Sequence, residues 1–297
     1  MSFFKFTKPL VEKIPGAAAY YRYLRDSKIL NSEVIFREKL GFFFNGNLSM
    51  EKGEFEPQET AIVESLLGSF DIFINIGANT GYYVCKALSR GVPVVAFEPN
   101  QMNVNVLLKN IEANKFGADF QFFPVGLSNQ HGVLPMYGAS TGASLIYGWG
   151  GQKNKYLVPI SKFDNIAKSL VDNKSCLVLI DIEGAELNCL KGAESLLTSS
   201  KNNVFIVEIL VKQHQPKGIN INPNLVETFN FMFSHGYEAF TADKSLRKVE
   251  PIELREIASS EIDTLGTHNF IFTRNKDILS KIIRRQKVVK NNEQPKS

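Results

Sequence analysis

The chain has 297 residues, of which 44% are hydrophobic and 22% are charged, close to the averages of globular proteins. This composition excludes a mostly disordered, collagen-like or coiled-coil chain, and no apolar stretch approaches the roughly 20 residues that span a bilayer. The formal net charge is 34 − 30 = +4, but residues 281–297 alone carry 6 − 1 = +5. The rest of the chain is close to neutral at 28 − 29 = −1, so we expect no nucleic-acid partner.

Cysteine usage and the first residues of the chain predict the compartment. The three cysteines, Cys85, Cys176 and Cys189, are odd in number, lack metal-type pairing and lie in apolar sequence, which is typical of buried thiols in a reducing compartment. Lys5 and Lys8 interrupt the hydrophobic residues at the amino terminus, so the apolar core of a signal peptide is missing. We expect a cytoplasmic protein.

Residues 1–55 are predicted to form an N-terminal extension of helices and a hairpin. Hydrophobic residues recur at roughly helical spacing over 3–14 and 17–30. A Phe-rich, loosely alternating stretch at 34–44 predicts a hairpin that ends at Asn45-Gly46-Asn47. We expect the amphipathic stretches to pack against the main domain, with weak peripheral contact to a membrane as the alternative.

Residues 56–275 are predicted to form one α/β domain with a doubly wound sheet, because short apolar strands alternate with helical stretches. The expected strands are 72–76, 92–97, 120–125, 177–182 and 204–210, with a last pair at 231–240 and 269–273. The expected helices are 57–67, 82–89, 102–114 and 186–197. Residues 276–297 are predicted to form a basic C-terminal helix and tail, a kind of segment that is most often a solvated end.

A glycine-containing turn joins the first expected strand of this domain to the helix after it. Gly77 and Gly81 are four residues apart, and Asn75 stands at the carboxyl end of the strand, where open α/β sheets bind ligands. Glu98 ends the next strand, where a carboxylate can accept hydrogen bonds from both hydroxyls of a ribose. The residues predicted to bind a nucleoside cofactor here are Asn75, Gly77, Asn79, Gly81, Tyr82 and Glu98.

The spacing of this turn distinguishes two classes of nucleoside cofactor. A dinucleotide turn prefers G-x-G-x-x-G, whereas here Asn79 stands where the second glycine belongs and would crowd a pyrophosphate. A polar side chain at this position suits a ligand with an amino-acid end, such as S-adenosylmethionine. Two alternatives stay open: an NAD-dependent dehydrogenase, and a non-catalytic nucleoside-binding or scaffold protein.

Three carboxylates, Asp181, Glu183 and Glu186, surround the end of a later apolar strand. The dipole of the following helix is enough to explain Glu183 and Glu186. Asp181 directly follows the apolar run and is expected to point into the same crevice as Gly77, so we predict that it contacts the cofactor or the acceptor. The cluster can also hold Mg²⁺ through oxygen ligands, with Glu208 at the next strand end, although the predicted reaction does not require a metal.

A methyl acceptor that is a hydroxyl benefits from a general base within hydrogen-bond reach. The candidates are Asp181, His214 and Glu183, with His268 and His235 ranked lower. A loop at 138–151 contains five glycines, Tyr147 and Trp149, the single tryptophan of the chain. Two interpretations of this loop are open: a lid or stacking floor for a sugar ring, and a hairpin whose aromatic side chains fold onto the core.

Together these motifs resemble the FkbM-type family of S-adenosylmethionine-dependent methyltransferases. The similarity covers about residues 56–210 and includes I-N-I-G-A-N-T-G-Y-Y, V-A-F-E-P-N and L-L-K-N-I-E-A-N within 73–114. Further matching segments are 126–129, 142–145, 158–166 and 180–193. The resemblance implies a class I methyltransferase fold, which is a Rossmann-like, seven-stranded sheet with the last strand antiparallel. It places the methionine end of the cofactor at Gly77, Asn79 and Gly81, and its ribose at Glu98.

One residue departs from the family pattern, because Asn75 stands where the family usually has Asp. An amide can accept a hydrogen bond but carries no charge for the ammonium group of the cofactor. The sequence as a whole predicts an S-adenosylmethionine-dependent methyltransferase. Its expected acceptor is a hydroxyl of a saccharide or of a glycosylated small molecule, and the sequence does not indicate the oligomeric state.

Overall fold

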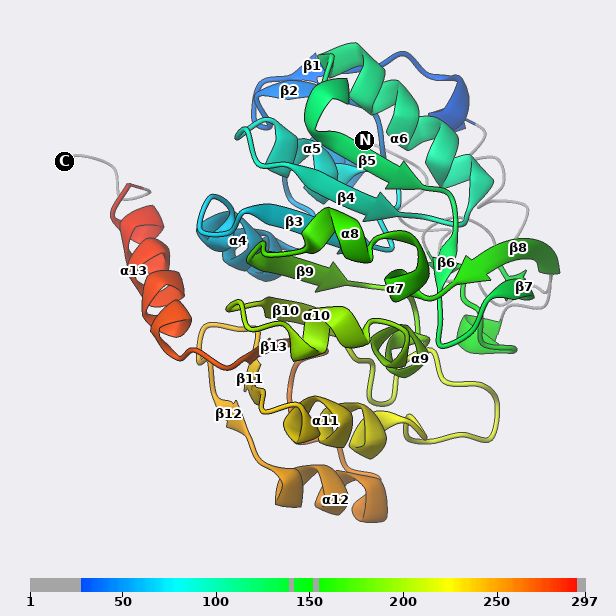
Figure 1. Ribbon diagram of the computed structural model, residues 1–297, viewed down its shortest axis with the longest axis vertical. Helices are drawn as coiled ribbons and strands as arrows, with labels where there is room; N and C mark the ends of the chain where they lie inside the picture. Colours follow the sequence, from blue (N-terminus) through cyan, green and yellow to red (C-terminus); the bar gives the residue numbers. More distant parts are fainter. Residues whose placement is uncertain (1–27, 139–141, 152–154, 293–297) are drawn as a thin grey trace, which may run out of the picture.

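The computed structural model describes residues 28–138, 142–151 and 155–292, and its centre is an eight-stranded sheet (Figure 1). The strands lie in the order β12-β11-β13-β10-β9-β3-β4-β5. Their bounds are β3 (Ile72–Ile76), β4 (Val94–Phe97), β5 (Phe120–Phe123), β9 (Cys176–Ile180), β10 (Val204–Glu208), β11 (Glu238–Thr241), β12 (Lys248–Val249) and β13 (Asn269–Thr273).

The direction of the strands confirms the predicted doubly wound fold. The five strands from β5 to β10 run parallel, whereas β13, the last strand of the chain, runs antiparallel to both β10 and β11. Every residue of β3, β4 and β9 is buried, as expected for strands covered on both faces. The two-residue strand β12 adds an eighth, short edge strand to the seven that were expected.

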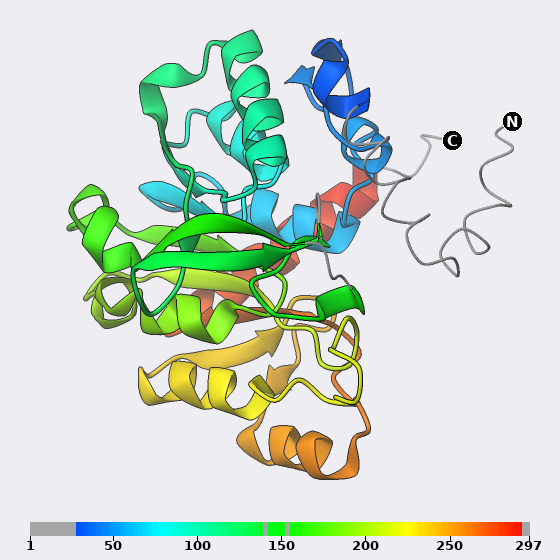
Figure 2. The same cartoon turned by 90° about the vertical axis from the view of Figure 1, so that its right-hand side faces the viewer.

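Helices cover both faces of the sheet (Figures 1 and 2). Residues of α4, α5, α6 and α13 share a hydrophobic cluster with Phe73 of β3. Residues of α7 to α12 form the opposite cluster with Ile74 and Ile76. The helices are α3 (Leu48–Glu51), α4 (Pro57–Leu66), α5 (Tyr82–Leu88), α6 (Gln101–Asn114), α7 (Phe163–Ile166), α8 (Lys168–Val171), α9 (Glu186–Lys191), α10 (Glu194–Thr198), α11 (Leu225–Ser234), α12 (Pro251–Ser260) and α13 (Asp277–Asn292).

Two predicted elements differ from the structure. The strand expected at 231–240 is wrong over most of its length, because the chain continues helix α11 to Ser234 and enters β11 only at Glu238. Leu225, Phe229 and Met232 are buried at helical spacing, so one face of the helix packs on the sheet. The helix expected at 186–197 is two short helices, α9 and α10. They separate at Gly192, where an added Cβ would lie 2.0 Å from the carbonyl oxygen of Ser128.

The predicted hairpin is present as β1 (Ile35–Arg37) and β2 (Phe42–Phe44), which pair antiparallel. Asn110 and Asn114, one turn apart on α6, attach it to the main domain. Asn110 accepts a hydrogen bond from the Asn45 amide and donates one to its carbonyl, each 2.9 Å long, and Asn114 bonds the backbone of Phe43 in the same way. The helix expected at 3–14 lies outside the described residues, as does most of the one expected at 17–30.

A small second sheet was not expected from the sequence. It consists of β6 (Gly126–Leu127), β8 (Lys155–Ser161) and β7 (Gly132–Tyr137), in that order. We call this second sheet the β6–β8 arm. It lies on the side of the molecule toward which the carboxyl ends of β4 and β9 point (Figure 1). The arm therefore adds a wall next to the edge of the main sheet at which ligands usually bind.

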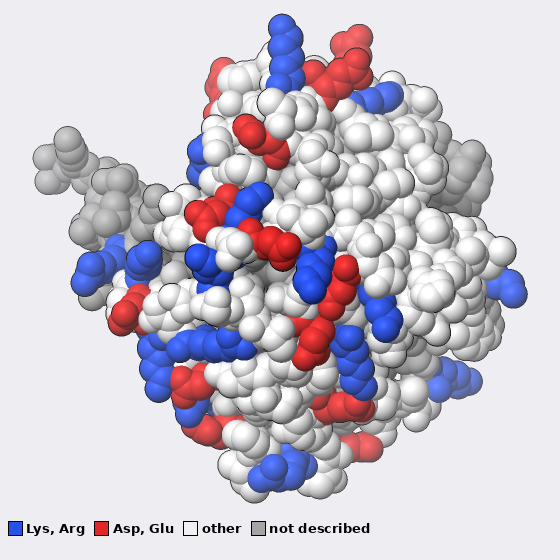
Figure 3. Space-filling view, in the orientation of Figure 1, with Lys and Arg blue, Asp and Glu red and all other residues white. Residues whose placement is uncertain are grey.

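The C-terminal helix α13 packs along α4 and buries Ile278 and Ile282. Within the described part of the chain, no helix combines the length and the apolar character needed to cross a membrane. On the face drawn in Figure 3, basic and acidic side chains lie side by side. The three cysteines are buried and unpaired, as predicted.

Candidate active site

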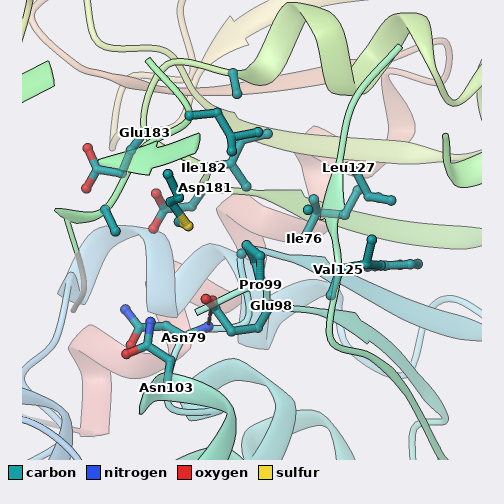
Figure 4. A pocket seen from close by; sticks show the side chains of 17 residues that line it. Ile76, Asn79, Glu98, Pro99, Asn103, Val125, Leu127, Asp181, Ile182 and Glu183 are labelled. Carbon is teal, nitrogen blue, oxygen red and sulfur yellow. Dashed lines mark hydrogen bonds between the residues drawn. The ribbon is translucent and has the colours of Figure 1, made fainter. Parts of the chain in front are cut away.

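A pocket lies at the carboxyl ends of β3, β4 and β9, beside the β6–β8 arm (Figure 4). It is partly open to solvent and is lined by both polar and apolar side chains. Asn79, Glu98 and Asn103 lie on one side of it, and Asp181 and Glu183 on the other. The apolar side chains that line it are Ile76, Phe97, Pro99, Val125, Leu127, Met136, Ala143, Leu145, Ile182 and Ala185.

Gly77 forms the floor of the pocket, where β3 meets β9. Its amide donates a 3.0 Å hydrogen bond to the carbonyl of Phe97, and the Asp181 amide donates one of 3.0 Å to the carbonyl of Ile76. Gly77 has a φ of +85°, and an added Cβ would lie 1.8 Å from the carbonyl oxygen of Asp181. Only glycine fits here, because the backbone approaches a second strand end in a left-handed conformation.

Glu98 is held in a fixed orientation by the two turns beside it. Its Oε2 accepts a 2.8 Å hydrogen bond from the Asn79 amide, and its Oε1 accepts one of the same length from the Asn100 amide. The side chain of Asn103 is also hydrogen-bonded to this carboxylate. Burial raises the pKa of Glu98 to about 6, and these three donors partly oppose that rise because they stabilise the ionised form.

Three of the predicted cofactor residues do not line the pocket. Tyr82 is in the hydrophobic core, where its ring packs edge-on against Phe44 and Phe55. Its predicted contact with the cofactor is therefore not supported by the structure, because the first turn of α5 directs this side chain away from the pocket. Gly81 is the residue before α5 and faces Leu107. Asn75 is 1% exposed and lies on the α4 face of the sheet.

Asp181 lies in the pocket wall next to further carboxylates. Burial, followed by the charge of Glu183, raises its pKa to about 8. Its side chain is hydrogen-bonded to Glu208 at the end of β10, and burial raises the pKa of Glu208 as well. Two carboxyl groups can share a hydrogen bond only if one of them is protonated. The predicted proximity of Asp181 and Glu208 is thus confirmed, and at least one of the two carries a proton near neutral pH.

The loop before β8 is docked onto Glu183, and its two aromatic side chains differ: Trp149 is buried, as in the second interpretation, whereas Tyr147 is exposed. Trp149 is 3% exposed, and its Nε1 donates a 2.7 Å hydrogen bond to Glu183 Oε2. The Ser144 hydroxyl donates a 2.5 Å bond to the carbonyl of Glu183. Tyr147 remains 65% exposed and packs edge-on against Tyr137. The loop is thereby held beside the pocket through the turn that follows β9.

Of the predicted histidines, His214 lies at the turn that follows β9. His214 Nδ1 lies 3.4 Å from Glu183 Oε2, and this contact raises the pKa of the imidazole. His268, ranked lower in the sequence analysis, lies 3.6 Å from Glu208 through its Nε2. His235 instead approaches Glu194 on the surface. Neither His214 nor His268 lines the pocket, so both act on it only through the carboxylates they contact.

Two site residues were missed by sequence reasoning. Glu56 and Glu59 belong to the start of α4 and lie close enough to Asp181 that their charges affect one another. Burial raises the pKa of both. Acidic residues in the first turn of a helix are ordinary in any sequence, so their position alone gave no signal. Glu186, by contrast, accepts a hydrogen bond from the Gly184 amide and remains outside the pocket.

Comparison with known proteins identifies the family. A family model described as the methyltransferase FkbM domain matches residues 75–239, and no curated protein matches the sequence. Among solved structures, the chain is similar to methyltransferase FkbM from Methylobacillus flagellatus KT, with 14% sequence identity and a TM-score of 0.44 over 87% of this chain and 60% of that chain. It is also similar to precorrin-6y C5,15-methyltransferase from Geobacter metallireducens GS-15, with 10% sequence identity and a TM-score of 0.37 over 69% of this chain and 82% of that chain. This chain thus spans 60% of the length of the Methylobacillus protein. Because the family model covers more than half of the sequence, the chain belongs to the FkbM methyltransferase family.

Proposed function

We propose that this methyltransferase uses S-adenosylmethionine to methylate a hydroxyl oxygen of a saccharide or of a glycosylated small molecule. The observation that supports the cofactor best is the position of Glu98. It is a buried carboxylate at the end of β4, fixed by backbone amides and facing the same pocket as the Gly77 turn. A carboxylate has about four acceptor positions, so Glu98 keeps capacity for a ribose hydroxyl, with Asn103 beside it for the second.

The rest of the pocket fits the remaining parts of this cofactor. Pro99, Val125 and Leu127 give an apolar wall next to Glu98, which suits a purine ring. On the other side, Asp181 and Glu183 offer carboxylates near the Gly77 turn, which suits a cationic amino-acid end.

When bound, the cofactor supplies an electrophilic methyl group, and the protein has to position the acceptor and take up its proton. Asp181 is the best-placed general base, because it lines the pocket and its pKa of about 8 is close to physiological pH. Glu183 lines the same wall and holds His214, so a proton can pass from the pocket to an imidazole near solvent.

The cofactor is tested by calorimetric titration of the full chain with S-adenosylhomocysteine, the product of the reaction, and with NAD. We expect binding of S-adenosylhomocysteine only, and Glu98→Gln weakens it about tenfold or more because a charged acceptor is lost. Glu194→Gln, which removes an exposed carboxylate outside the pocket, is the matched control. Binding of NAD alone, or equal affinity in Glu98→Gln, rules out the proposed cofactor.

The reaction is tested with the methyl-labelled cofactor and two panels of acceptors, one of carbohydrates and one of hydroxyl compounds without a sugar. Label on the carbohydrates alone supports the proposed acceptor. Label on the second panel alone rejects the saccharide, and bound cofactor with no transfer to either panel favours a binding or scaffold protein.

A further inference from the structure

A group of carboxylates lies at the carboxyl ends of β9 and β10, at the edge of the pocket. Asp181, Glu183 and Glu208 each offer one oxygen atom, and these three atoms lie within 4.8 Å of one another. Two oxygens that bind the same ion at about 2.0–2.6 Å cannot be more than about 4–5 Å apart. The spacing of the three carboxylates is therefore that of ligands around a single cation.

The register of the sheet places two of these side chains on one face. Leu179 of β9 pairs with Asn75 of β3 on one side and with Ile206 of β10 on the other. Asp181 and Glu208 each follow two residues later, so their side chains leave the sheet on the same face as that of Asn75. This face is covered by α4, whose first turn contributes Glu59. The ends of β9 and β10 thus place Asp181 and Glu208 on the face of the sheet that also carries Asn75 and is covered by α4.

Two of these oxygen atoms have no hydrogen-bond partner among the described residues. They are Oδ1 of Asn75 and Oε1 of Glu59, in side chains that are 1% and 3% exposed. A buried acceptor without a donor costs about 1–3 kcal/mol, so such atoms usually mark a missing ligand or water. Both side chains lie on the α4 face, and Glu59 is close enough to Asp181 for their charges to interact. An ion bound by the carboxylates, or water held by that ion, gives both oxygen atoms a partner.

Among the described residues, this group has no lysine or arginine partner. In the part of the chain that the structure describes, its ion pairs are those of Glu183 with His214 and of Glu208 with His268, and none involves lysine or arginine. A divalent cation supplies positive charge to this group and also satisfies the two unpartnered oxygens, directly or through its water ligands.

We propose that Asp181, Glu183 and Glu208 bind one divalent cation of the Mg²⁺ or Mn²⁺ class. An all-oxygen ligand set with carboxylates favours these hard ions over Zn²⁺ or Cu²⁺. His214 and His268 contact the ligands from outside and hold their orientation. Binding of the ion does not depend on the proposed reaction. With the ion bound, Asp181 is a ligand and not a free base, so the ion itself would hold the acceptor hydroxyl and promote loss of its proton, a role that rests on that proposed function.

The experiment uses the full chain after treatment with EDTA and without cofactor. Mn²⁺ is added, and the free ion is measured from its electron paramagnetic resonance signal. We expect one bound Mn²⁺ per chain, displaced by excess Mg²⁺. Asp181→Asn and Glu208→Gln each weaken binding by about tenfold or more. Glu186→Gln, which alters a buried carboxylate near the same turn but outside the ligand set, retains the affinity. Circular dichroism shows which variants are folded.

Absence of a stoichiometric Mn²⁺ site in the unmodified chain overturns the proposal. The same holds for unchanged affinity in a folded Asp181→Asn or Glu208→Gln variant. A parallel titration with S-adenosylhomocysteine in EDTA separates this proposal from the proposed function. If this compound binds and Mn²⁺ does not, the cation site is rejected and the cofactor stands. If Mn²⁺ binds and the compound does not, the cofactor is rejected and the cation site stands.

Discussion

Gly77 sets how closely two strand ends approach in the candidate site. The amide of Asp181 bonds the carbonyl just before Gly77, and the carbonyl of Asp181 occupies the space where a side chain would stand. The same backbone contact therefore positions both Gly77, in the floor of the pocket, and Asp181, the candidate general base. A change at this position affects both the stability of the fold and the geometry of the site.

Gly77→Ala is expected to lower the free energy of unfolding by about 3 kcal/mol or more. A left-handed φ costs a residue with a Cβ about 1–2 kcal/mol, and forcing atoms into packed space adds about 1–3 kcal/mol. Gly68→Ala is the matched control, because Gly68 has a φ of +80° but nothing within 4 Å of an added Cβ. Denaturant unfolding measures both variants, and equal losses contradict the role of the close approach.

Single residues at strand ends were the most predictable part of the site. Gly77, Glu98 and Asp181 follow apolar strands, and parallel strands bring their carboxyl ends to one edge. The misplaced Tyr82 shows the limit, because the direction of the first side chain in a helix depends on how that helix is rotated against the sheet. Glu59 shows another limit: its contacts depend on where α4 lies, which no local pattern contains.

At the scale of elements, the loop before β8 acts as one wall of the site because it is fixed at Glu183. Glu183 has a φ of +56°, an uncommon conformation for a residue with a side chain. Ser144 bonds its carbonyl and Trp149 bonds its carboxylate, so the loop supports this conformation from two directions. We infer that the orientation of Glu183 depends on the docked loop.

Ser144→Ala is expected to weaken the docking of this loop by about 1–2 kcal/mol, because two partly buried hydrogen-bond partners lose the Ser144 hydroxyl. Trp149, the single tryptophan, reports the change directly, since its fluorescence is shielded while its side chain is buried. Quenching by acrylamide should rise clearly in this variant. Ser234→Ala, which removes an exposed hydroxyl on α11, should leave quenching unchanged. Equal quenching in all three proteins argues against a loop held by Ser144.

The sequence predicted the strands of the main sheet better than those of the β6–β8 arm. Strands β3 and β13 have the expected bounds, because each is a mostly apolar stretch in which every residue is buried. The arm was missed because Pro135 and Pro159 stand inside β7 and β8, and proline argues against a central strand. Both strands belong to a small sheet that packs by tertiary contact, so sequence periodicity alone could not reveal it.

For the whole molecule, buried carboxyl groups make the stability dependent on pH. Burial raises the pKa of Glu98 to about 6 and that of Glu186 to about 7, above their usual value of 4.5. The folded protein therefore binds these protons more tightly than the unfolded chain does. Their contribution to stability is fully present below about pH 4.5 and is lost as the pH rises through about 6 and 7.

The unmodified chain in EDTA should accordingly unfold at a lower temperature at about pH 8 than at about pH 5.5. The two groups together account for a loss of a few kcal/mol. Glu98→Gln and Glu186→Gln should each flatten this slope, because a neutral amide replaces the group that loses its proton. Glu194→Gln, an exposed carboxylate, should keep the full slope. Carboxylates whose pKa is lowered in the fold, such as Glu64, lose their stabilising contribution only at more acidic pH, so the chosen pH range is free of their effect. If the unmodified chain instead becomes more stable toward pH 8, burial does not raise the pKa of these carboxyl groups.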